Sequence, residues 1–258
     1  MRLPITNVYA KGDFTVCVSI GSEAIKLQLI LDTGSSTLAL HSSRYQPQLD
    51  THLQPTTLVQ EVIYGIGGWA GPVTQTSMQL HGDVSLTLPQ NFVALATRGE
   101  PPLAKADGIL GLAYKRLNQA TDISEFLAHQ QPALSASLPW PFRQCGVDAL
   151  KQIAAILQDY PKHNLPPWFS NIEQHGVVAN IFAFYCRRSS IHRTAQQTHT
   201  SQDPLNQGWF ILGGGVEQHD LYDSDFQNIR VWHDVYYNVQ LTAIQVGDLA
   251  PLPCPPEN

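Results

Sequence analysis

The sequence predicts a mainly β protein with a few short helices, of the sandwich or barrel type. Short runs in which apolar and polar residues alternate recur along the chain, and turn residues, often glycine, separate them. Helical spacing of apolar residues is confined to a few segments after residue 114. Many short strands combined with few helices favour packed or closed sheets.

The first third of the chain predicts two hairpins. Alternating runs at 14–20 and 25–31 flank the turn residues Gly21-Ser22-Glu23. Residues 57–80 repeat this arrangement around a glycine-rich tip at 65–71. Residues 83–97 predict two further short strands.

Helices are predicted in the middle of the chain. Residues 122–130 begin with Asp122 and carry Glu125 three residues later, which is a capping-box arrangement. Residues 146–160 space apolar residues as a helix does, and residues 166–177 start with prolines and predict another short helix.

Strand character returns in the last third. Alternating or apolar runs occur at 178–188, 208–215, 228–235 and 236–247, and we predict a strand in each. Residues 189–207 are polar and weakly patterned, which is typical of a surface loop.

Composition excludes several classes of partner. The 258-residue chain has a net charge of −6 and no run of Lys and Arg, so we expect no nucleic-acid partner. Apolar stretches stay shorter than the roughly 18 residues that span a bilayer, so we expect no membrane partner. The N-terminus lacks the apolar core of a signal peptide, and the predicted location is cytoplasmic.

Metal and cofactor sites are not predicted. The four cysteines stand far apart without a CxxC pair, and the ten histidines form no HExxH motif. We interpret the cysteines as reduced thiols. The glycines near residue 65 are not followed by a helix with Lys-Ser/Thr, so they do not indicate a phosphate-binding loop.

The stretch LILDTGSSTLAL, residues 29–40, places the carboxylate of Asp32 directly after an apolar strand. Gly34 allows a tight turn, and the hydroxyls of Thr33 and Ser35 are potential hydrogen-bond donors to a carboxylate. An acid among such donors stays ionised despite partial burial, which suits a general base that takes a proton from water. Alternatively, Asp32 only caps a β-turn in a structural domain, since Asp-Thr-Gly is ordinary turn chemistry.

The same stretch resembles the first active-site loop of the pepsin-like aspartic proteases, and four later segments resemble this family in the same order. VIYGIGGWAG, residues 62–71, resembles the flap hairpin. ADGILGLAY, residues 106–114, resembles the segment that places an apolar-apolar-Gly triplet beside the catalytic loop. Residues 166–186 resemble the helix and strand that close the N-terminal lobe, and residues 209–247 resemble the opening of the C-terminal lobe.

The resemblance implies a pepsin-like bilobal acid protease fold. Residues 1–188 would form a complete N-terminal lobe with a helical insertion near 115–165, and residues 189–258 a partial C-terminal lobe. It also implies an aspartic endopeptidase that needs no cofactor and cleaves an extended polypeptide with a water activated by two aspartates. The implied site residues are Asp32 as a catalytic acid, Thr33, Gly34 and Ser35 as support of its loop, and Tyr64, Gly65 and Gly67 as the flap over the substrate. In this interpretation Thr33 braces the two catalytic loops against each other, and Ser35 hydrogen-bonds Asp32.

This chain contains a single Asp-Thr-Gly and no Asp-Ser-Gly, although the chemistry requires two carboxylates. Three explanations stay open. The chain is a fragment or processed piece, and the remainder of the C-terminal lobe supplies the second aspartate. Alternatively, two copies pair so that two Asp32 residues meet, or the chain is a catalytically inactive peptide-binding relative.

Other departures from the family lie near the first loop. Leu38-Ala39-Leu40 occupies the stretch where the family usually has a tryptophan, and Trp69 is a candidate to compensate. The following loop lacks the cysteine pair of many secreted members, and we expect no prosegment before the first strand. These features resemble the bacterial pepsin homologues, and they imply an enzyme that is active as synthesised.

Overall fold

The computed structural model describes residues 1–63, 67–99, 101, 103–146, 148–191, 200–223, 225–233 and 235–255, and it is mainly β, as predicted. The strands are β1 (Arg2–Ala10), β2 (Asp13–Ile20), β3 (Ile25–Asp32), β4 (Leu38–His41), β5 (Gln54–Ile63), β6 (Gly68–His81), β7 (Ser85–Ala96), β8 (Arg98–Gly99), β9 (Gly108–Gly111), β10 (Gln119–Asp122), β11 (Lys162–Asn164), β12 (Phe182–Cys186), β13 (Gln207–Leu212), β14 (Ala243–Ile244) and β15 (Leu252–Pro253). The α-helices are α1 (Ser124–Ala128), α2 (Ala149–Leu157) and α3 (Trp168–Gln174).

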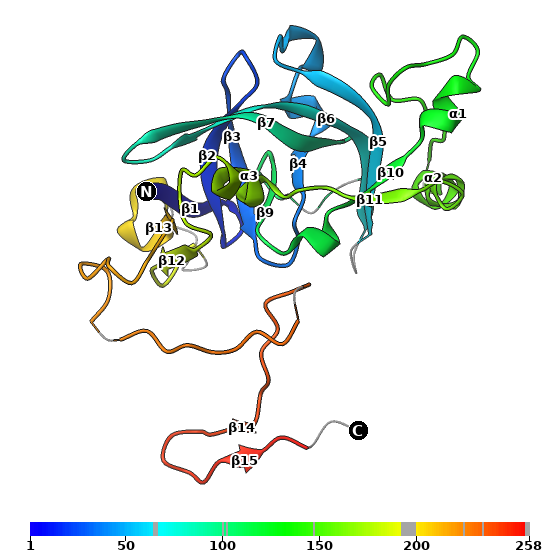
Figure 1. Cartoon of the computed structure of the whole chain (residues 1–258). Coiled ribbons are helices and arrows are strands. Elements are labelled where there is room, and N and C mark those ends of the chain that lie inside the picture. The colour runs from blue at the N-terminus through cyan, green and yellow to red at the C-terminus, as the bar shows by residue number, and fades with distance from the viewer. Residues whose placement is uncertain are drawn as a thin grey trace.

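Strands β1 to β13 belong to one large, strongly curved sheet (Figure 1). Its order is β11-β10-β5-β6-β7-β4-β9-β3-β2-β1-β13-β12, and β8 pairs with β6. Because β2 also pairs with β6, the strands β2, β3, β9, β4, β7 and β6 close into a ring. This ring is a barrel-type arrangement, one of the two architectures, sandwich or barrel, that the sequence predicts.

The first predicted hairpin forms with β2 and β3. Thr15 lies opposite Ile30, and Ile20 lies opposite Ile25. Gly21 occupies the turn with a φ of +74°, a backbone conformation that other residues rarely adopt. The alternating apolar residues of both strands belong to the main core.

Two parts of the sheet differ from the prediction. Residues 85–96 form one strand of 12 residues, β7, where the sequence predicts two short ones. Its register with β6 shifts between Thr76 and Met78, and such an irregularity lets one long strand bend. The second difference is β1, which the sequence analysis does not predict and which pairs with both β2 and β13.

All three predicted helical segments contain a helix. α1 begins at Ser124, whose backbone N–H donates to Asp122 Oδ1 at 2.9 Å. α2 buries Ile153 and Leu157, and α3 packs against β7. The predicted helical insertion near 115–165 contains α1 and α2, and it also contributes β10 and β11, which extend the sheet beyond β5.

Residues 213–255 differ from the rest of the chain. No strand forms in the described residues of 228–235, and of 236–247 only Ala243–Ile244 form a strand, β14, which pairs with β15. Exposed apolar or aromatic side chains in this segment are Val216, Phe226, Ile229, Trp232, Tyr236, Tyr237, Val239, Leu241, Ile244, Val246, Leu249 and Leu252. The prediction fails because a strand needs a paired neighbour and a covered face, and the described elements supply neither here.

The predicted lobe boundary at residue 188 lies within a continuous part of the sheet. β12, which ends just before this position, pairs with β13, and β13 pairs with β1 at the other end of the chain. The division into two lobes therefore stays a prediction.

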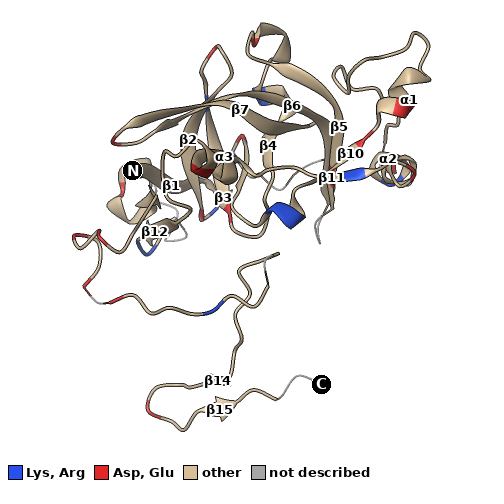
Figure 2. Cartoon of the chain, in the orientation of Figure 1, with Lys and Arg blue, Asp and Glu red and all other residues tan. Residues whose placement is uncertain are grey.

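Lys and Arg residues are scattered over several elements, and so are Asp and Glu residues (Figure 2). Arg2 forms an ion pair with Asp220, and Arg44 forms one with Asp107 at 3.1 Å. None of the described helices combines the length and the apolar character that crossing a membrane requires.

Candidate active site

Asp32 is the last residue of β3 and lies between two neighbouring strands. β3 pairs in parallel with β9, so that Ile30 faces Ile109, Leu31 faces Leu110 and Asp32 faces Gly111 in the ladder. The predicted position of the apolar-apolar-Gly triplet beside the Asp-Thr-Gly loop is therefore confirmed.

Backbone hydrogen bonds hold the loop that follows Asp32. The N–H of Leu112 donates to the carbonyl of Asp32 at 2.7 Å, and the N–H of Ala113 donates to the carbonyl of Ser35 at 2.8 Å. The N–H of Gly111 donates to the carbonyl of Thr37 at 3.0 Å. A Cβ at Gly111 would lie 2.6 Å from Ser36 Cα, so only glycine allows the two segments to cross this closely.

The Asp32 carboxylate accepts a hydrogen bond at 2.8 Å from the N–H of Gly34. It is half-buried, while Thr33 and Gly34 are exposed at the tip of the loop. In the described residues, no Lys or Arg forms an ion pair with it. The carboxylate is thus oriented by a neutral donor and stays accessible to a water or a ligand.

Ser35 does not play the role predicted from the resemblance. Its hydroxyl is buried and, like that of Ser36, has no hydrogen-bond partner among the described residues. Ser35 supports the loop through its backbone carbonyl, which accepts from Ala113. The donor that reaches the Asp32 carboxylate is the backbone N–H of Gly34, and the hydroxyl of Ser35 donates no hydrogen bond to it.

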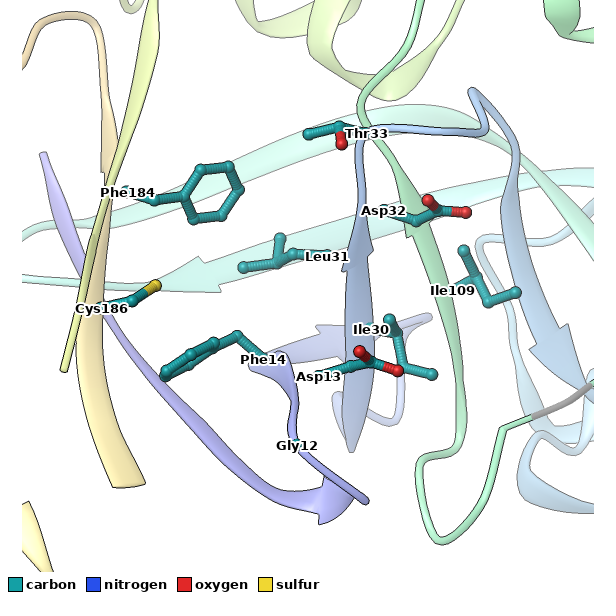
Figure 3. Close-up of a pocket in the computed structure, with 10 residues that line it drawn as sticks. All are labelled: Gly12, Asp13, Phe14, Ile30, Leu31, Asp32, Thr33, Ile109, Phe184 and Cys186. Carbon is teal, nitrogen blue, oxygen red and sulfur yellow. The ribbon is translucent and has the colours of Figure 1, made fainter. Parts of the chain in front are cut away.

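An open cavity of ≈ 580 Å³ adjoins Asp32. Its lining residues are Gly12, Asp13, Phe14, Ile30, Leu31, Asp32, Thr33, Ile109, Phe184 and Cys186. Figure 3 shows the Asp32 carboxylate on the side of Ile109, with Leu31 directed toward Phe184. A carboxylate at the edge of a largely apolar cavity suits a ligand with apolar side chains and a polar backbone.

The predicted flap hairpin is formed by β5 and β6. The predicted flap residues Tyr64 and Gly65 lie outside the described residues, so their roles stay predictions. Gly67 is described and has a φ of +76°, and a Cβ at Gly68 would lie 2.6 Å from the carbonyl oxygen of Val62. Both glycines are therefore required for the tight approach of the two strands next to the tip.

Trp69 lies in the hairpin, 1% exposed. It belongs to the same cluster of buried side chains as Ala39, the residue in the stretch where a tryptophan was expected. The small side chain of Ala39 and the large one of Trp69 thus help to fill one core region.

Three interactions around the loop were not predicted. Buried Trp168 on α3 donates its indole N–H to the carbonyl of Gly111 at 2.8 Å, and Tyr237 donates its hydroxyl to the carbonyl of Leu112 at 2.7 Å. Buried Gln60 donates to Asn118 Oδ1 at 2.8 Å. The sequence contains a sign of the role of Gln60, because Gln60 is a polar residue at an apolar position of an alternating run. The hydrogen bonds of Trp168 and Tyr237 join distant segments, and the local sequence contains no sign of them.

The described residues contain no group of three or more His, Cys, Asp and Glu side chains that suits a metal ion.

Comparisons with known proteins agree with this geometry. A family model described as eukaryotic aspartyl protease matches residues 13–134. Vacuolar protease A of Neurospora crassa is 32% identical over 260 residues, covering 95% of this chain and 50% of that protein. Polyporopepsin of Irpex lacteus is 32% identical over 110 residues, and pepsin A of Callithrix jacchus is 27% identical over 136 residues. These two matches cover 43% and 45% of this chain, and 30% and 33% of those proteins.

The solved structure of the aspartic proteinase from Irpex lacteus has a similar fold. The TM-score is 0.54 at 20% sequence identity, and the match covers 84% of this chain and 48% of that one. The predicted pepsin-like fold is therefore confirmed. The chain spans about half the length of the vacuolar protease A that it matches and about half of this structure.

Proposed function

Because this chain is a relative of the eukaryotic pepsin-like aspartic proteases, we propose that it forms one half of the catalytic site of an aspartic endopeptidase. The observation that carries this proposal is the position of Asp32. Asp32 is the last residue of β3. Its carboxylate accepts a hydrogen bond from the N–H of Gly34 and adjoins an open, largely apolar cavity. The crossing backbone of Leu112 and Ala113 supports the loop from below.

Hydrolysis in this family requires a second carboxylate next to the first. Two acids held close together share one proton, because both cannot ionise at once; the aspartic proteases are the well-known example. The ionised acid takes a proton from a water, whose oxygen then attacks the carbonyl carbon of the peptide. The protonated acid donates to the carbonyl oxygen, and the tetrahedral intermediate collapses with protonation of the leaving nitrogen. No covalent bond to the protein forms.

We propose that the second aspartate comes from polypeptide outside these 258 residues, namely the remainder of the C-terminal lobe. Three observations support this source. The sequence contains one Asp-Thr-Gly, the matched vacuolar protease is about twice as long, and residues 228–252 expose a series of apolar side chains. Exposed Thr33 would then brace the second catalytic loop, as the resemblance implies.

Two alternatives concern the source and the activity of the site. A second copy of the chain would bring two Asp32 residues together, provided that the predicted partial C-terminal lobe, residues 189–258, swings away. An inactive relative would keep the peptide groove without turnover, which the single Asp-Thr-Gly favours.

The substrate that we propose is an extended polypeptide bound between the cavity and the β5–β6 hairpin. Apolar lining residues such as Phe14, Ile30 and Phe184 favour apolar side chains at the cleaved bond. A cytoplasmic location and a bacterial character are further predictions from the sequence, and the relatives named above are eukaryotic.

The test compares Asp32 with an exposed carboxylate outside the cavity, that of Glu23 in the turn between β2 and β3. Activity on an unfolded protein is measured at about pH 4 for the chain alone and for the chain joined to the second half of its own gene product. We expect Asp32→Asn to lower kcat at least about 10³-fold, and Glu23→Gln, the matched control, to leave kcat within about threefold. Full activity in Asp32→Asn would overturn the proposal.

The same samples separate the alternatives. Activity only in the joined protein supports a second aspartate from the remaining lobe. Activity of the chain alone that rises with the square of its concentration supports the paired copy. Binding of a non-hydrolysable peptide by every form, without turnover in any, supports the inactive relative.

A further inference from the structure

The helical part of the insertion, residues 123–160, packs on the outer face of the β5–β6 hairpin (Figure 1). It forms a second, smaller core with two fully buried residues of that hairpin, Val59 on β5 and Ala70 on β6. The buried side chains that the insertion contributes to this core are Ile123, Leu127, Phe142, Ile153 and Leu157. The hairpin therefore has a covered outer face as well as an inner face that packs on the main body.

Polar contacts join the insertion to β5 in a fixed register. Ser137 is fully buried, and its N–H donates to the carbonyl of Thr56 at 2.8 Å. Its hydroxyl donates to the carbonyl of Leu58 at 2.7 Å. The N–H of Ile123 donates to the carbonyl of Thr57 at 3.1 Å. Three successive residues of β5 thus receive hydrogen bonds from the insertion, and sliding of the strand would break all of them.

A second line of contacts runs from α2 to the base of the hairpin tip. A Cβ at Gly99 would lie 2.1 Å from the carbonyl oxygen of Gly68 and 2.8 Å from Leu150 Cδ1, so these three residues touch. Gly99 pairs with Trp69, and Arg98 Nε donates to the carbonyl of Gln144 at 3.3 Å. Leu150 of helix α2 therefore contacts Gly99, and Gly99 contacts Gly68, the first residue of β6.

We propose that Leu150 and Ser137 are positioning residues, which hold the described strands of the β5–β6 hairpin in a fixed position against the insertion. A two-stranded hairpin by itself is marginally stable in water, so the layer behind it determines how far it moves. Leu150 acts through Gly99 on the tip, and Ser137 acts on the strand that leads to it. In the active enzyme, and here the inference rests on the proposed function, this brace limits how far the hairpin lifts from a bound peptide.

Hydrogen exchange of the full 258-residue chain tests the brace without any activity. We expect Leu150→Ala to speed exchange of the amides of residues 59–71 about tenfold while the amides of β3 keep their rate. Ser137→Ala is expected to act in the same direction, and Leu150→Met to restore the original rate. Gln152→Ala is the matched control, because this residue lies on the exposed side of the same helix.

Two results would overturn the proposal. One is faster exchange in α2 alone, with residues 59–71 unchanged in Leu150→Ala. The other is an equal effect of Gln152→Ala on the hairpin. If Leu150→Ala unfolds the chain, which faster exchange of β3 would reveal, the smaller truncation Leu150→Val decides by the same two criteria.

A binding measurement connects the brace to the substrate. We expect Leu150→Ala to raise the Kd of a non-hydrolysable apolar hexapeptide about fivefold, mainly through faster dissociation. If the wild-type chain does not bind the peptide, the proposed function fails, while the exchange result still supports or overturns the brace.

Discussion

Residues 13–32 and residues 228–247 carry the same kind of sequence and adopt different structures. In the first region β2 and β3 pair with each other, and each has a further neighbour in the ring, β6 for β2 and β9 for β3. In the second region, the described residues include only the two-residue strand β14, and Ile229, Trp232 and Val239 are 69%, 54% and 54% exposed. The difference lies in the surroundings and not in the local pattern.

This contrast shows what a strand in this protein requires. Alternation of apolar and polar residues creates a face that gains free energy when it is buried, but the backbone groups also need a paired neighbour. The ring supplies both to β2 and β3. The described residues supply neither to 228–242, which contact the main body chiefly through Tyr237.

The largest expected effect is in hydrogen exchange of the two regions. Amides of β2 and β3 are expected to exchange at least about 10⁴-fold more slowly than those of 228–242, because the former open only with the cooperative core. Mass spectrometry of peptic peptides from the full chain measures both at once. Equal protection would break the comparison, since it would mean that the second region forms strands in solution.

Single substitutions of one buried and one exposed tryptophan test the comparison further. Trp168 is 2% exposed and donates to the carbonyl of Gly111 beneath the candidate site, so Trp168→Ala is expected to lower the free energy of unfolding by about 3–5 kcal/mol. Trp232 is 54% exposed, and Trp232→Ala is expected to change it by less than about 0.5 kcal/mol. Urea denaturation measures both. A large loss in Trp232→Ala would indicate that its region is part of the cooperative core.

The comparison also explains how much of the fold was predictable. The β2–β3 hairpin and the three helices follow from local patterns, and the structure contains them. The strand predicted at 228–235 is absent from its described residues, and the one predicted at 236–247 is reduced to β14, because an alternating pattern does not show whether a partner strand is present. β1 was missed, and its partners β2 and β13 include one that is about 200 residues away.

The candidate site divides in the same way. The position of Asp32 at the end of the strand and beside Gly111 was predictable from the motif and the triplet. The absent Ser35–Asp32 contact and the support of the loop by Trp168 and Tyr237 depend on side-chain orientations and on segments that meet only in the folded chain. A single sequence does not show which distant segments meet or how their side chains are oriented.

Two carboxylates with the same lowered pKa separate local from global effects. Asp50 is 8% exposed; burial alone would raise its pKa, but hydrogen bonds from Thr76, Tyr45 and the N–H groups of Ser22 and His52 lower it to about 2. The pKa of Glu217, in the C-terminal segment, is also about 2, chiefly because the N–H of Gly215 donates to it.

Only Asp50 is expected to contribute to global stability. Its folded-state pKa is below the ordinary value, so its contribution, about 2 kcal/mol, is present above about pH 4 and is lost as the pH falls toward 2. Asp50→Asn should remove this pH dependence between pH 4 and 2, whereas the exposed Glu217→Gln should leave the unfolding curve unchanged. Urea titrations at several pH values measure this, and the reverse assignment would contradict the comparison.

The smallest expected effect concerns the contact that joins the two regions. Tyr237 donates to the carbonyl of Leu112 and packs on Tyr114 with ring centroids 4.9 Å apart, and partial burial raises its pKa to about 12. Tyr237→Phe removes one hydrogen bond, about 1 kcal/mol, and keeps the ring contact. Because 228–242 form no part of the ring, this loss should speed limited proteolysis of that segment about fivefold and leave the urea midpoint unchanged. Tyr236→Phe, a neighbouring and more exposed tyrosine, is the matched control; a lower urea midpoint in Tyr237→Phe would mean that the segment and the barrel unfold as one unit.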